Sequence, residues 1–356
     1  MSTHGHSHLW PGVPLALGSA ILFGASAPLS KLLLGIVDPW LLAGVLYLGA
    51  GIGLAVVLAA RGRVGLQTSE ARLRRSDGPW LVAIVFFGGM VGPVLLMFGL
   101  SQTSAASGSL LLNLEGLATM GIAWLVFREN VDRRLLLGAA AIVGGAMLLS
   151  WKQGGAQLDV GGLLIAGACL SWGIDNNLTR KLSSVDPVQI AMIKGLVAGI
   201  ANFILAFVLG ASLPHPVILA GGALIGFLGI GVSLVMFILG LRHLGAARTG
   251  AYFSLAPFIG AIISLVVFRD ALSWQLIAAG TLMAIGLWFH LTERHEHEHW
   301  HEALEHEHAH VHDEHHQHTH DGPVTEPHSH WHRHRPISHI HPHYPDLHHR
   351  HGHGHG

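Results

Sequence analysis

The sequence predicts an all-α integral membrane protein with ten transmembrane helices, arranged as two inverted five-helix repeats and followed by a disordered C-terminal tail. Three features support this prediction: few charged residues, ten apolar segments of spanning length, and an internal repeat. Of the 356 residues, 51% are hydrophobic and 12% are charged, whereas soluble domains carry about 25% charged residues. A chain with so few charges is suited to lipid rather than to water.

Ten segments are apolar and close to the length of about 20 residues that a helix needs to cross a bilayer. They are residues 13–34, 38–60, 79–100, 104–127, 133–151, 160–180, 187–210, 217–241, 247–268 and 272–291. The sixth and ninth segments are less apolar than the others because they contain polar side chains. Each segment is expected to form one spanning helix.

Basic residues are distributed unevenly over the breaks between these segments. The breaks after even-numbered segments contain Arg61, Arg63, Arg72, Arg74, Arg75, Arg128, Arg133, Arg134, Arg180, Lys181, Arg242 and Arg248, whereas those after odd-numbered segments contain only Lys31, Lys152 and Arg269. Short cytoplasmic loops are enriched in Lys and Arg. This asymmetry predicts a multi-pass cell-membrane protein with both termini in the cytoplasm.

The two halves of the chain resemble each other at nearly constant offsets. At an offset of 141 residues, Gly99-Leu100 recurs as Gly240-Leu241, Ala105-Ala106 as Ala246-Ala247, and Phe127-Arg128-Glu129 as Phe268-Arg269-Asp270. At an offset of 148 or 149, Phe23-Gly24 aligns with Trp172-Gly173 and Val37-Asp38-Pro39 with Val185-Asp186-Pro187. Because each repeat contains five helices, the second copy is predicted to enter the membrane from the opposite side, as in many secondary transporters.

Two blocks of the repeat, Ser104–Asn130 and Gly245–Leu272, resemble the EamA signature of the drug/metabolite transporter superfamily. In that signature, a helix of small residues with a central proline ends in an apolar run and an acidic residue. The second block fits this pattern through Pro257 and Asp270. The first block departs from it, since Gly116 takes the place of the proline.

The resemblance covers about residues 13–291 and implies alternating access around a central cavity. It covers a first EamA-like repeat (13–151) and a second (160–291), while composition and the distribution of basic residues predict a His-containing cytoplasmic N-terminus (1–12) and a His-rich cytoplasmic tail (292–356). It implies a small metabolite or drug-like solute and a bacterial inner membrane. We expect solute and lipid as partners and no nucleic acid, and the sequence leaves a homodimer open.

Ionisable and amide side chains inside the predicted spans are the candidate transport residues, because charge at membrane depth is costly. Glu115 lies near the middle of the fourth span, two residues after Asn113. A carboxyl group that faces the two sides alternately could couple transport to protons, although a structural Glu that bonds a neighbouring helix is the simpler alternative.

A second group of polar residues lies at the predicted cytoplasmic end of the sixth span, where Asp175, Asn176 and Asn177 are consecutive. Lys194 lies at a similar depth in the seventh span. An ion pair between Asp175 and Lys194 is therefore predicted, as a static link, a gate or a substrate contact. A pair between Lys194 and Glu115 is the alternative that the sequence leaves open.

The tail is dominated by histidine: 24 of the 30 His residues lie between His295 and His355. The alternation of His with other residues has no apolar period and predicts disorder. Imidazole binds Ni, Zn, Co and Cu. The predicted metal ligands are His295, His297, His299, His301, His306, His308, His310, His312, His315, His316, His318 and His320.

These features favour a secondary transporter, expected to be an exporter with Glu115 as the coupling carboxylate. Efflux of divalent Ni, Co or Zn, with the tail collecting ions, is the alternative within transport. A membrane-anchored metal buffer or sensor is an alternative of another class. No nucleophile–base pair, HExxH motif or Gly-rich phosphate loop is present, so we expect neither an enzyme nor a required cofactor.

Overall fold

The computed structural model describes residues 11–63, 73–127, 133–151, 159–182, 185–244, 246–269, 272–292, 298–301, 305–310, 328–333 and 337–340. The first half contains α1 (Gly12–Leu33), α2 (Pro39–Arg63), η1 (Arg75–Asp77), α3 (Gly78–Ile84), η2 (Val85–Val91), α4 (Gly92–Gln102), α5 (Ala105–Leu111), α6 (Leu114–Phe127) and α7 (Arg133–Ser150). The second half contains α8 (Val160–Thr179), η3 (Arg180–Leu182), α9 (Pro187–Val208), α10 (Pro216–Gly226), η4 (Phe227–Val232), α11 (Ser233–Leu244), α12 (Ala246–Phe253), α13 (Ala256–Phe268) and α14 (Trp274–Leu291).

The ten predicted spans are confirmed as ten helical segments. Nine of them, counted within the described residues, are long and apolar enough to cross a membrane. The tenth is α8, which has 20 residues but is less apolar because Asp175, Asn176 and Asn177 lie in its last turns. Several helices begin at a proline, as at Pro39 and Pro187. Proline has no backbone N–H, and in the first turn of a helix that N–H would have no helical acceptor.

Four of the spans are interrupted, at equivalent places in the two repeats. The fourth span is broken at Leu112 and Asn113, between α5 and α6, and the ninth at Ser254 and Leu255, between α12 and α13. The third and eighth spans contain the π-helical turns η2 and η4. π-helical turns are rare in proteins, and those that occur are often found at functional sites.

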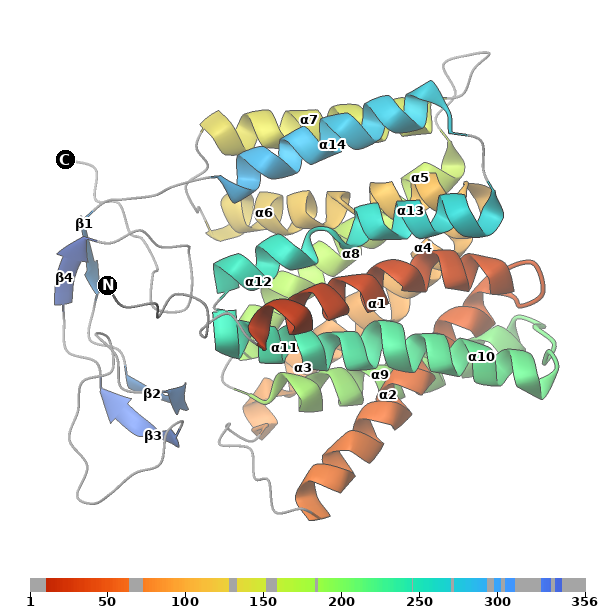
Figure 1. The fold of residues 1–356 in the computed structure, drawn as a ribbon. Coiled ribbons are helices and arrows are strands. Elements are labelled where there is room, and N and C mark those ends of the chain that lie inside the picture. Colours follow the sequence, from red (N-terminus) through yellow and green to blue (C-terminus); the bar gives the residue numbers. More distant parts are fainter. Residues whose placement is uncertain are drawn as a thin grey trace.

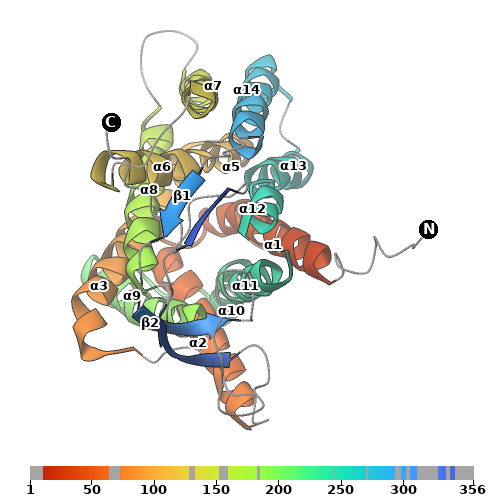
Figure 2. The same cartoon turned by 90° about the vertical axis from the view of Figure 1, so that its left-hand side faces the viewer.

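The two halves pack in matching ways, which confirms the repeat. Helix α1 of the first half packs against α11 and α13, and α8 of the second half packs against α4 and α6. Helices α2 and α9 pack against each other on the side of the bundle away from α7 and α14, which form a pair at the opposite edge (Figures 1 and 2). Within each pair the helices run in opposite directions, as expected for inverted repeats.

Close contact between α2 and α9 depends on glycine. A Cβ atom on Gly51 of α2 would lie 2.5 Å from the backbone N of Leu196, and one on Gly199 of α9 would lie 2.6 Å from the backbone N of Leu48. Small residues let membrane helices approach each other without a hydrophobic driving force. The many glycines of the sequence are therefore partly explained by this helix contact.

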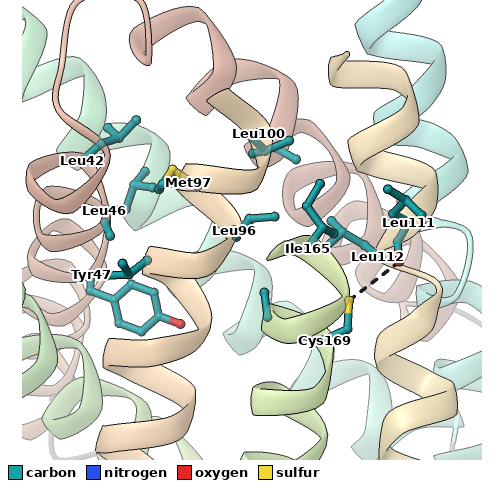
Figure 3. Packing of buried hydrophobic residues seen from close by; sticks show 14 of the residues in the cluster. Leu42, Leu46, Tyr47, Leu96, Met97, Leu100, Leu111, Leu112, Ile165 and Cys169 are labelled. Carbon is teal, nitrogen blue, oxygen red and sulfur yellow. Dashed lines mark hydrogen bonds between the residues drawn. The ribbon is translucent and has the colours of Figure 1, made fainter. Parts of the chain in front are cut away.

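Side chains are distributed as a lipid-facing bundle requires. The interior contains Leu42, Met97, Ile165 and Cys169, with the Cys169 thiol donating to the Leu111 carbonyl at 3.7 Å (Figure 3). Large apolar side chains such as Leu125 are exposed on the outside of the bundle, where lipid replaces water.

Basic residues of the described breaks gather at one end of the bundle, where α1 begins and α14 ends. This basic end includes Arg63 at the end of α2, Arg75 before α3, Arg133 at the start of α7 and Lys181 after α8. The other end, called here the opposite end, has Lys31 in the last turn of α1, where its ammonium donates to the Leu100 carbonyl.

The tail differs from the predicted disorder at four short strands. Strand β1 (Glu298–His301) pairs with β4 (Ile337–Ile340), and β2 (Glu305–His310) pairs with β3 (His328–Arg333), both antiparallel. Alternation of residue types with a period of two matches the strand period, and pairing distant segments gives each backbone a hydrogen-bonding partner. Of the predicted metal ligands, His295, His297, His312, His315, His316, His318 and His320 lie outside the described residues.

Candidate functional site in the membrane

The candidate site forms where α6 crosses α8. A Cβ atom on Gly173 of α8 would lie 2.8 Å from the Ala118 side chain and 2.9 Å from the backbone N of Thr119 on α6. Because glycine lets the backbones come so close, the polar side chains one turn away on each helix reach the other helix. Glu115, Thr119, Asn176 and Asn177 meet in this way.

The break in the fourth span determines where Glu115 lies. The helix stops at Leu111 and restarts at Leu114, so Glu115 is in the first turn of the 14-residue helix α6. The Leu110 carbonyl at this break accepts both the backbone N–H of Asn113, at 3.1 Å, and the Asn113 side-chain amide, at 2.8 Å. Carboxylates are favoured in the first turn of a helix, where unpaired N–H groups give a partial positive charge.

Asn176 connects the two helices through its amide nitrogen. It donates to the Glu115 Oε1 atom at 3.1 Å and lies 3.1 Å from the Thr119 hydroxyl oxygen. That hydroxyl in turn donates to the Glu115 carbonyl at 2.9 Å, one turn back along α6. The Glu115 carboxylate is thus half-buried and oriented by a side chain of the other repeat.

Lys194 of α9 forms an ion pair with Asp175 of α8, which decides between the two partners that the sequence left open. The Lys194 Nζ and Asp175 Oδ2 atoms are 2.7 Å apart, and the two side chains are 21% and 5% exposed. The Thr179 hydroxyl donates to the other carboxylate oxygen at 3.4 Å. A Cβ atom on Gly88 would lie 2.1 Å from Asp175 Oδ2, so this carboxylate depends on a glycine in η2.

Asn177 ties α8 to α6 through the backbone rather than through a charge. Its amide donates to the Thr119 carbonyl at 3.0 Å and to the Gly173 carbonyl at 2.8 Å. Its Oδ1 atom is buried without a hydrogen-bond partner among the described residues. An unpaired buried acceptor of this kind costs free energy.

The π-helical turn η2 is held by side chains that sequence reasoning did not single out. Tyr47 and Trp172 donate to the Gly88 carbonyl at 2.7 and 3.0 Å, Ser171 to the Phe87 carbonyl at 2.8 Å, and Asn202 to the Gly89 carbonyl at 3.2 Å. The Phe87 carbonyl also accepts the backbone N–H of Gly92, whereas Pro93 has no N–H to donate to the carbonyls of Gly88 and Gly89. Of these residues, only Asn202 could have been singled out from the sequence, because an amide side chain inside a spanning helix is costly.

The polar side chains belong to only one of two equivalent helix crossings. The crossing of α1 with α13 matches that of α8 with α6, because Gly24 approaches Ala256 and Gly260 as Gly173 approaches Ala118 and Thr119. At the repeat offsets, Glu115, Thr119, Asp175, Asn176, Asn177 and Lys194 correspond to Ala256, Gly260, Ser26, Ala27, Pro28 and Leu46. The fold therefore forms this crossing without ionisable or amide side chains at the corresponding positions.

Five of the six predicted transport residues are brought together, namely Glu115, Asp175, Asn176, Asn177 and Lys194. Asn113 is not, because its amide is directed at the Leu110 carbonyl and the Met283 sulfur atom, at 2.8 and 3.9 Å. Within the part of the chain whose side chains are described, no group of three or more His, Cys, Asp or Glu residues could hold a metal ion.

Comparison with known proteins places these features in a family context. The chain matches the model of the EamA-like transporter family over residues 10–151 and again over 159–292. An uncharacterized transporter of Methanothermobacter thermautotrophicus is 30% identical over 295 residues, which cover 78% of this chain and 85% of that protein. The uncharacterized transporter YyaM of Bacillus subtilis is 26% identical over 293 residues, covering 77% and 93%.

A solved crystal structure has the same fold. It aligns with a TM-score of 0.58 over 78% of this chain and 95% of its own length, at 18% sequence identity. At that identity the similarity concerns the arrangement of the helices and not the chemistry of the site.

Proposed function

Because this chain belongs to the EamA-like transporter family, we propose that it is a secondary transporter that exports a small metabolite or drug-like solute by alternating access. Two inverted repeats around a polar centre suit such a cycle. Both termini lie in the cytoplasm in this proposal, with the basic end of the bundle facing inward. No enzymatic step is part of it.

The observation that supports a functional centre most strongly is the asymmetry between the two helix crossings. If the carboxylates and amides were needed only to hold helices together, the α1–α13 crossing would need them as well. That crossing has Ala256 and Gly260 where the α8–α6 crossing has Glu115 and Thr119. Polar groups that the fold does not need, and that cost free energy in a membrane, are best explained by transport.

Glu115 is the proposed coupling residue. Its carboxylate accepts a hydrogen bond from Asn176, which belongs to the other repeat. When Glu115 binds a proton, it loses its negative charge and one of its acceptor positions. Proton binding then weakens the attachment of α6 to α8, so the relative movement of the repeats and the protonation of Glu115 depend on each other.

The test compares Glu115→Gln with the full chain reconstituted in proteoliposomes. The probe is a radiolabelled solute chosen from a metabolite panel by its increased export from cells that carry the chain. Glutamine keeps the size of the side chain and cannot exchange protons, so we expect flux driven by a pH gradient to be lost while solute counterflow continues. Full pH-driven flux in Glu115→Gln would show that this residue is not the coupling group.

Asp38→Asn provides a matched control. Asp38 is also a carboxylate, but it caps the start of α2 through the backbone N–H groups of Trp40 and Leu41, at 2.8 and 3.2 Å. Asparagine caps helices about as well as aspartate. This variant is expected to retain pH-driven flux, which separates the loss of one particular carboxylate from a general effect of removing charge.

A further inference from the structure

Strands β2 and β3 of the tail pair in a register that sets histidine opposite histidine at every second position. The pairs are His306 with His332, His308 with His330, and His310 with His328. Residues 311–327 separate the two strands in the sequence. The register therefore selects, among many tail histidines, six positions that lie next to one another.

These six positions share one face of the two-stranded ribbon. Successive residues of a strand alternate between its two faces, so positions 306, 308 and 310 lie on one face together with their partners. The positions on the other face are Glu305 opposite Arg333, Glu307 opposite Trp331, and Ala309 opposite Ser329. The ribbon thus has one face of histidine positions and one of mixed composition.

We propose that this histidine face, formed by residues 306, 308, 310, 328, 330 and 332, is a binding site for a borderline transition-metal ion such as Zn²⁺, Ni²⁺, Co²⁺ or Cu²⁺. Residues directly opposite each other in an antiparallel pair have Cβ atoms about 4.5–5.5 Å apart. Two imidazoles so placed can reach one ion, since zinc–nitrogen bonds are about 2.0–2.1 Å long. Neutral imidazole suits these ions, whereas Mg²⁺ and Ca²⁺ prefer oxygen ligands.

Cross-strand pairs are the units of this site. Neighbouring pairs on the same face are about 7 Å apart along the strand, twice the rise per residue, so two neighbouring pairs together offer up to four nitrogen ligands. Binding requires both strands, and the ion stabilises their pairing because it has no preformed site in the unpaired tail. This differs from chelation by any flexible run of His-x-His, in which all tail histidines are equivalent.

The test measures Zn²⁺ binding to the full chain in detergent, in competition with a chromophoric chelator. One variant replaces His328, His330 and His332 with Asn, and a second replaces His306, His308 and His310. A matched control replaces His351, His353 and His355, so that each chain loses three histidines. Either ladder variant is expected to weaken the tightest Zn²⁺ binding at least tenfold, while the control retains it.

A variant with all six substitutions distinguishes the site from general chelation. If the two strands form one site, removing both halves weakens the tightest binding no more than removing either half alone. Equal losses in the control and the ladder variants, or losses that add between the two halves, would overturn the proposal. Its outcome is independent of solute transport, because binding is measured without flux.

Discussion

At the scale of single residues, the membrane interior contains a charged pair whose environment is built around it. The Asp175 carboxylate lies against Gly88 and pairs with Lys194 at 2.7 Å. A buried ion pair contributes little net stability compared with an apolar pair, but removing one partner is costly because a charge is left behind. Net stability alone therefore does not explain the pair, which is consistent with the transport function proposed above.

This argument predicts the outcome of a double-mutant cycle. Lys194→Met leaves the nearly buried Asp175 carboxylate unpaired, and loss of one partner of a buried pair costs about 3–5 kcal/mol. We expect an apparent Tm in detergent well below that of the unchanged chain, and a clearly higher Tm for the double variant Asp175→Asn/Lys194→Met. Additive effects of the two single changes would contradict the pairing.

At the scale of elements, some spanning helices are continuous and others are interrupted by a break or a π-helical turn. The third, fourth, eighth and ninth spans are interrupted, while α2 and α9 run through and pack closely on glycines. The break in the fourth span positions Glu115, and η2 supplies carbonyls that Tyr47 and Trp172 occupy. The interrupted spans thus position Glu115 and the carbonyls of η2, while the continuous helices α8 and α9 carry Asp175, Asn176 and Lys194.

Two glycines of α10 test the importance of close packing. A Cβ atom on Gly226 would lie 1.9 Å from the Leu46 carbonyl oxygen of α2, a backbone atom that cannot move alone, whereas one on Gly221 would meet no atom within 4 Å. Gly226→Ala is therefore expected to lower the Tm, and Gly221→Ala to leave it unchanged or raise it slightly, since alanine favours helix. Equal Tm values for both variants would rule out this contact.

At the scale of the whole molecule, the ten spans give the bundle two distinct ends, and the basic end is proposed to face the cytoplasm. The orientation can be tested by cysteine labelling because Cys169, the one cysteine in the sequence, is fully buried. Ser76 in η1 is exposed at the basic end, and Leu213, between α9 and α10, is 57% exposed at the opposite end.

A membrane-impermeant maleimide applied to intact cells is expected to label Leu213→Cys and not Ser76→Cys. Permeabilising the cells should allow both variants to react, while the unchanged chain stays unlabelled throughout. The reason is that lipid blocks the reagent from the basic end until the membrane is opened. Labelling of Ser76→Cys alone in intact cells would mean that the protein has the opposite orientation.

Much of the site was visible in the sequence, and the missing part has a physical explanation. Glu115, Asp175 and Lys194 stand out because charge is rare inside apolar segments. Tyr47 and Thr119 do not, since such residues are ordinary in spanning helices and their roles depend on the wide turn η2 and on the crossing at Gly173. The direction of the Asn113 amide, toward Leu110 and Met283, could not be predicted because nearness in sequence does not determine direction at a helix break.

The sequence by itself determined the ten spans, the two repeats and the polar positions within them. These properties depend on whether each segment is surrounded by lipid or by water. The composition of the segment itself largely decides this. Only the tertiary structure decided that Lys194 pairs with Asp175, that Asn176 reaches Glu115, and that two tail segments align His308 with His330. Such pairings depend on how helices cross and strands align, and contacts between segments distant in sequence fix that geometry.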